Sequence, residues 1–144
     1  MTVREALVNA QGGELRMLAV VPAGKRAGIA RQLAPLKPEI LFLDRLSEAG
    51  VAIREDDAFQ VALLPASLSD TDWWELWGVL ALLNPRPEIL VYARQATFLL
   101  WSGVLELGCY DVIVDPFSDE ALRGAVLAAA KSFEERRLND SQPE

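Results

Sequence analysis

Five short apolar runs, separated by segments with helical character, limit the folds that are open to this chain. The runs occupy residues 15–21, 39–43, 61–64, 88–92 and 111–114, and a proline closes three of them. Runs this short, and rich in valine, isoleucine and leucine, are typical of strands buried on both faces. Because short helical segments connect them, we predict one parallel sheet with helices on both sides, an α/β architecture of three layers.

Five helical segments are predicted between and after these strands. The first follows a turn at 24–26, places Ile29, Ala30 and Leu33 on one side, and ends before Pro35. The remaining four are expected at about 47–55, 72–83, 98–107 and 119–138.

Two residues mark helix ends, and the polar termini mark the limits of one domain. Gly108 is suited to the C-terminal cap of the fourth helix, and Ser118 to the N-terminal cap of the fifth. We expect a domain at 14–138, a mobile lead-in at 1–13 and a disordered tail at 139–144.

The composition excludes several classes of function. A net charge of −7 argues against a nucleic-acid partner, and no apolar stretch is long enough for a membrane span. The first residues lack the apolar core of a signal peptide, so a cytoplasmic location is expected. The chain has no histidine, which excludes Ser-His-Asp catalysis and the common zinc sites. Its one cysteine, Cys109, is expected to be a packed residue.

In an open parallel sheet, ligand sites lie beyond the carboxyl ends of the strands. The residues expected there are Val21, Pro22, Pro65, Tyr92 and Asp115. Asp115 is the single charge among them. The sequence leaves open whether its carboxylate pairs with Lys25, pairs with Arg94 or is solvated.

Two further stretches carry a family resemblance. LSDTDWWEL at 68–76 follows the third predicted strand, and GCYDVIVDPF at 108–117 includes the fifth. Their spacing resembles that of response-regulator receiver domains, the CheY-like family. The resemblance covers about residues 14–138 and implies a flavodoxin-like (CheY-like), doubly wound sheet of five parallel strands. It also implies a place in bacterial two-component or phosphorelay signalling.

The resemblance assigns the family's chemistry to particular positions. Receivers hold Mg²⁺ with an acidic pair after the first strand and a phosphorylated aspartate after the third, and they use a hydroxyl and a lysine after the fourth and fifth. The matching residues here are Val21 and Pro22, Pro65, Tyr92 and Asp115, with Val112 in place of the family's switch aromatic. We therefore expect a pseudo-receiver without the phosphoacceptor aspartate, with no metal and no cofactor.

Large apolar side chains gather on two of the predicted helices. They are Trp73, Trp74 and Trp77 on one, and Leu99, Leu100 and Trp101 on the other. Neighbouring helical positions differ by about 100°, so neither set can face inward completely. The sequence does not decide between packing and an interaction surface for either group.

These observations predict a signalling module that is not an enzyme and acts through a protein partner or a homodimer. The alternative is a small-molecule sensor that uses the vacated apolar site, bordered by Pro22, Pro65, Tyr92 and Trp73.

Overall fold

The computed structural model describes residues 15–43, 59–66, 80, 86–95, 97–106 and 108–141. Within these ranges the elements follow the order β1 (Arg16–Val20), α2 (Ala23–Leu33), the short 3-10 helix η2 (Ala34–Leu36), β2 (Glu39–Leu43), β3 (Val61–Pro65), β4 (Glu88–Ala93), α5 (Phe98–Glu106), β5 (Asp111–Val114) and α6 (Asp119–Ser141). The predicted helices at about 47–55 and 72–83 lie outside the described residues, apart from Leu80, which is buried.

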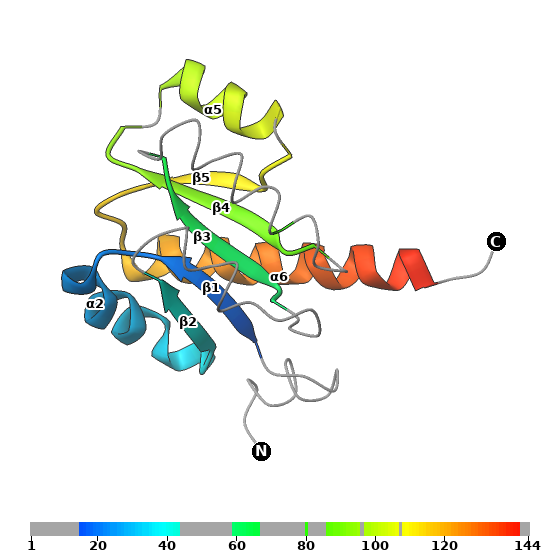
Figure 1. The fold of residues 1–144 in the computed structure, drawn as a ribbon, viewed down its shortest axis with the longest axis horizontal. Helices are drawn as coiled ribbons and strands as arrows, with labels where there is room; N and C mark the ends of the chain where they lie inside the picture. The colour runs from blue at the N-terminus through cyan, green and yellow to red at the C-terminus, as the bar shows by residue number, and fades with distance from the viewer. Residues whose placement is uncertain are drawn as a thin grey trace.

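The five strands form one parallel sheet in the order β2-β1-β3-β4-β5 (Figure 1). Strand order reverses beside β1, so the carboxyl ends of β1 and β3 meet at the switch point of a doubly wound fold. This arrangement confirms the predicted flavodoxin-like (CheY-like) fold, and each of the five predicted strands is present.

Both faces of the sheet are covered, as its apolar strands predict. In β3, Val61 and Leu63 pack into a core shared with α2 and α6, whereas Ala62 and Leu64 pack into the core on the opposite face, shared with α5. All four side chains are fully buried. Successive residues of a strand point to opposite faces, so an uninterrupted apolar run requires helices on both. Figure 1 shows α5 apart from α2 and α6 across the sheet.

Both predicted helix caps, at the end of α5 and at the start of α6, are confirmed. Gly108 has φ 93°, the left-handed conformation that glycine adopts without strain after a helix. The Ser118 side-chain oxygen accepts a hydrogen bond of 3.0 Å from the backbone N–H of Ala121, near the start of α6.

Helix α2 begins earlier than predicted. The helix starts at Ala23, and residues 24–26 belong to its first turn. The Lys25 N–H donates a hydrogen bond of 2.9 Å to the Pro22 carbonyl there. Ile29 and Leu33 are buried as predicted, but Ala30 is exposed. Residues 29 and 33 share a helix face, and residue 30 is turned about 100° away from it.

Helix α6 ends at Ser141, inside the range predicted as a disordered tail. Good helix formers fill residues 134–138 and carry the helix up to the polar end, and no glycine or proline follows Gly124 until Pro143. An ion pair of 2.8 Å between Arg137 and Glu134, one turn apart, supports the second half of the helix.

A polar network ties this half of α6 to the amino edge of the sheet. Glu88, the first residue of β4, is only 8% exposed and accepts a hydrogen bond from the Ser132 hydroxyl. Arg136 lies 3.3 Å from the same carboxylate and donates to the Arg86 carbonyl at 2.5 Å. The Gln60 side chain joins the Arg16 backbone N–H to the Glu134 carboxylate.

Candidate functional site

The carboxyl edge of the sheet brings together the five positions expected there from the sequence. Val21 and Pro22 follow β1, Pro65 ends β3 opposite Tyr92 in β4, and Asp115 follows β5. Two backbone hydrogen bonds hold the outgoing loops on the sheet: the Ala66 N–H donates to the Tyr92 carbonyl at 2.9 Å, and the Asp115 N–H donates to the Ala93 carbonyl at 2.8 Å.

Tyr92 occupies the centre of this edge. Its hydroxyl donates a hydrogen bond of 2.9 Å to the Val20 carbonyl, so the side chain of a β4 residue reaches past β3 to the end of β1. The residue is 7% exposed and belongs to the core shared with α2 and α6. Burial, and secondarily the negative charge of Asp115, raises the pKa of Tyr92 to about 12. The phenol is therefore neutral near pH 7.

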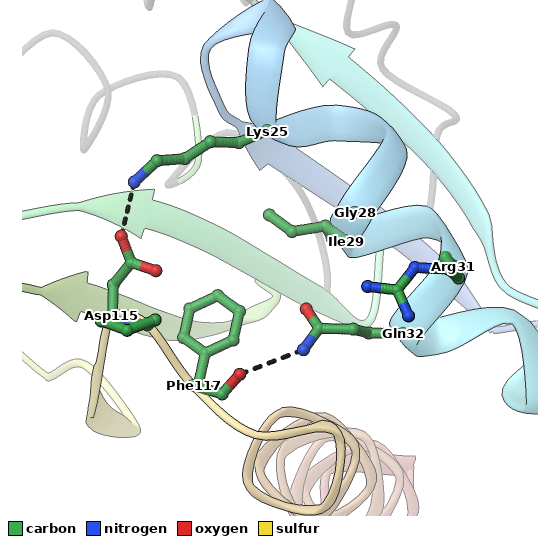
Figure 2. A pocket seen from close by; sticks show the side chains of 8 residues that line it. Lys25, Gly28, Ile29, Arg31, Gln32, Asp115 and Phe117 are labelled. Atoms are coloured by element: carbon green, nitrogen blue, oxygen red, sulfur yellow. Dashed lines mark hydrogen bonds and ion pairs between the residues drawn. The ribbon is translucent and has the colours of Figure 1, made fainter.

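Asp115 forms an ion pair with Lys25, one of the two partners that the sequence left open. The Lys25 ammonium lies 2.5 Å from a carboxylate oxygen of Asp115 and 5.9 Å from the centre of the Tyr92 ring (Figure 2). The Asp115 side chain is mostly buried, whereas that of Lys25 is about half exposed. The peptide bond from Asp115 to Pro116 is cis. The pair joins the first turn of α2 to the loop between β5 and α6.

Three further hydrogen bonds hold α2 against the same edge. Arg26 Nε donates to the Val21 carbonyl at 3.1 Å, and Gln32 Nε2 donates to the Phe117 carbonyl at 3.0 Å. Arg123 Nε of α6 donates to the Gln32 carbonyl at 2.6 Å. These three residues are not predictable from the sequence, because long polar side chains that bond distant backbone carbonyls leave no periodic pattern.

A small open pocket of about 240 Å³ lies between α2 and the loop after β5. Its lining residues are Lys25, Gly28, Ile29, Arg31, Gln32, Asp115, Pro116 and Phe117. It shares the Lys25–Asp115 pair with the carboxyl edge, but Pro65 and Tyr92 do not line it. The pocket is thus displaced from the predicted vacated site, which Pro65 and Tyr92 border.

Of the two predicted apolar groups, the structure describes the one on α5. Leu99 is 82% exposed, Trp101 is 43% exposed and Leu100 is half-buried. Phe98, beside them, is 79% exposed. The three tryptophans at 73, 74 and 77 lie outside the described residues.

Cys109 is buried as expected, and burial raises the pKa of its thiol to about 11 although the nearby Arg86 charge lowers it. Among the described residues, no group of three or more acidic or cysteine side chains is placed to hold a metal ion. No helix in the same part of the chain is long and apolar enough to cross a membrane.

Comparison with known proteins identifies the fold through structures alone. No protein-family model and no curated protein sequence matches the chain. A CheY-like response regulator receiver domain protein from Methanospirillum hungatei superposes with a TM-score of 0.70 at 20% identity, covering 86% of this chain and 99% of that one.

Two further solved structures give the same result. A response regulator from Thermotoga maritima superposes with a TM-score of 0.72 at 13% identity, over 82% of this chain and 98% of that one. NtrX from Brucella abortus gives 0.74 at 19% identity, over 91% of this chain and 30% of that longer one. The chain therefore has the fold of response-regulator receiver domains.

Proposed function

We propose that this chain is a receiver-like signalling module that acts by contact with a protein partner or a second copy of itself, without phosphorylation at the carboxyl edge. The proposal rests on the side chains that occupy the carboxyl edge of the sheet in this receiver fold. A phosphorylation site would need open space and a cluster of acidic side chains at this edge. The protein has the buried Tyr92 and the Lys25–Asp115 ion pair there instead.

The described side chains at this edge do not suit phosphoryl transfer. Pro65, at the end of β3, has no nucleophilic group, and Val21 and Pro22 provide no side-chain oxygen. Mg²⁺ requires several oxygen ligands in near-octahedral geometry, so these residues do not fit the ion that receivers use. Asp115, the one acid among them, is paired with Lys25, so neither charge is free to hold a metal ion or a phosphoryl group.

An exposed apolar surface supports the contact part of the proposal. Phe98, Leu99 and Trp101 of α5 are exposed, and so is Val114 in the adjacent edge strand β5. We call these four residues the α5 patch. Large apolar side chains grouped on a surface favour association, because burying them removes apolar area from water. We propose that the module acts by contact and is not an enzyme.

Intact-mass spectrometry after incubation with acetyl phosphate and Mg²⁺ tests the first half of the proposal. We expect the mass of this chain to stay unchanged, while a receiver domain with an aspartate at the end of its third strand gains one phosphoryl group in the same tube. A stoichiometric adduct on this chain would contradict the proposal.

A charge placed in the α5 patch tests the second half. Leu99→Glu is compared with Leu127→Glu, a control at an exposed leucine of α6. We expect the wild type either to dimerise in sedimentation experiments or to capture a protein from its native host. Leu99→Glu should lose that association and Leu127→Glu should keep it. A wild type that binds neither, or a Leu99→Glu variant that binds normally, contradicts the proposal.

The alternative, a sensor with its ligand in the vacated site, has less support. Tyr92 is buried there and its hydroxyl already bonds the Val20 carbonyl, so a ligand would have to displace that side chain.

A further inference from the structure

The pocket between α2 and the loop after β5 has an apolar centre and a charged group at each end. Figure 2 shows the Phe117 ring and the Ile29 side chain between the Lys25–Asp115 pair on one side and Arg31 and Gln32 on the other. The volume of about 240 Å³ lies below the range of roughly 300–1,000 Å³ for drug-sized ligands, so a smaller molecule fits it.

The two ends of the pocket differ in charge. Lys25 and Asp115 neutralise each other. The Arg31 side chain forms no hydrogen bond or ion pair with any residue in the described part of the chain, so its end is positive. The composition of α2 agrees with this sign, because the helix contains Arg26 as well as Arg31 and no acidic residue, in a chain of net charge −7. A planar guanidinium binds a carboxylate through two parallel hydrogen bonds.

The charge at the far end limits the ligand further. Because Lys25 offsets the charge of Asp115, this end of the pocket offers no free cation for a second negative group on the ligand. Ile29, Pro116 and Phe117 supply apolar surface for an aromatic or aliphatic body.

Gly28 keeps the pocket open from the side of the helix. A Cβ atom at this position would meet no other atom within 4 Å. The φ angle of Gly28 is not positive, so the backbone conformation does not require glycine. A larger side chain there would enter the pocket without a clash against the protein. Gly124 of α6 has equally free space but does not line the pocket, which makes it a matched control.

We propose that this pocket binds a small monocarboxylate with an apolar body, its carboxylate on Arg31 and its body on Ile29 and Phe117. The site is distinct from the α5 patch and does not depend on the proposed signalling function. Association through α5 can fail while this site binds its ligand, and the reverse also holds.

The test is a titration of the ¹⁵N-labelled full chain with phenylacetate, followed by NMR. We expect saturable shifts confined to Gly28, Gln32 and Phe117 and their neighbours, with the neutral phenylacetamide binding at least about tenfold more weakly. Shifts that are absent or spread over other surfaces overturn the proposal. So does binding of the amide that is as tight as that of the carboxylate.

Two pairs of variants locate the site. Gly28→Leu should abolish the shifts and Gly124→Leu should preserve them. Arg31→Gln should weaken phenylacetate binding about tenfold, whereas Lys131→Gln, which removes the same charge from an exposed position of α6, should leave it unchanged. Equal affinities within either pair overturn the proposal. Arg31→Gln keeps the test decisive if Gly28→Leu does not fold.

Discussion

The amino and carboxyl edges of the sheet both carry polar groups, but they hold them in different ways. At the amino edge, the nearly buried Glu88 carboxylate contacts Ser132 and Arg136 of α6. At the carboxyl edge, the buried group is the neutral phenol of Tyr92, and the ion pair above it is partly open to water. A buried charge that loses its partner is costly, whereas a partly exposed pair contributes little. The comparison indicates that the amino edge stabilises the fold and that the carboxyl edge can change without unfolding it.

Removing the partner of the buried carboxylate is expected to have the largest effect. Arg136→Ala leaves Glu88 with the Ser132 hydroxyl alone, so we expect the free energy of unfolding to fall by about 2–3 kcal/mol, measured by urea denaturation. Arg137→Ala, which breaks only the exposed pair with Glu134, should cost about 0.5 kcal/mol or less. Equal losses in the two variants would remove the difference between the edges.

Tyr92 is expected to make the carboxyl edge sensitive to alkali. Its pKa in the folded protein is about 12 against an ordinary value of 10, so the folded protein holds the phenolic proton more tightly than the unfolded chain. This contribution to stability is complete below pH 10 and is lost as the pH rises toward 12. The wild type should therefore lose up to about 2 kcal/mol more than Tyr92→Phe between about pH 9 and about pH 12.

The chain contains two tyrosines, so Tyr110→Phe provides the control for this titration. We expect it to keep the wild-type pH dependence. At neutral pH, Tyr92→Phe should cost only about 1 kcal/mol, the typical contribution of one hydrogen bond. A Tyr92→Phe variant with the same alkaline profile as the wild type would show that folding does not raise the pKa of Tyr92.

The smallest effect is expected from the Lys25–Asp115 pair. Asp115→Asn should change the free energy of unfolding by no more than about 1 kcal/mol, and the change should shrink in high salt. The same variant should lower the pKa of Tyr92, because it removes the negative charge that helps to raise it. The control is Asp119→Asn, which breaks a 3.8 Å pair with Arg123. If Asp115→Asn lowered the free energy of unfolding as much as Arg136→Ala does, both edges of the sheet would carry a stabilising charge pair.

The sequence predicts the sheet and the contents of its carboxyl edge more fully than the contacts made there. Strands such as β3 are predictable because a run buried on both faces leaves only apolar residues. Pro65, Tyr92 and Asp115 are predicted to share an edge because parallel strands end on the same side. The partners are not predictable from local pattern. Lys25 meets Asp115 across 90 positions, and Tyr92 bonds a carbonyl two strands away.

The attachment of α6 has a mechanical consequence. Arg123 holds the first half of the helix to the Gln32 carbonyl, and Arg136 holds the second half to Glu88. These residues are 136 − 123 = 13 positions apart, about 20 Å along a helix. A rigid rod fixed at two points so far apart cannot pivot about either one. Any movement that starts at the carboxyl edge must therefore break one of these two attachments or leave the helix in place.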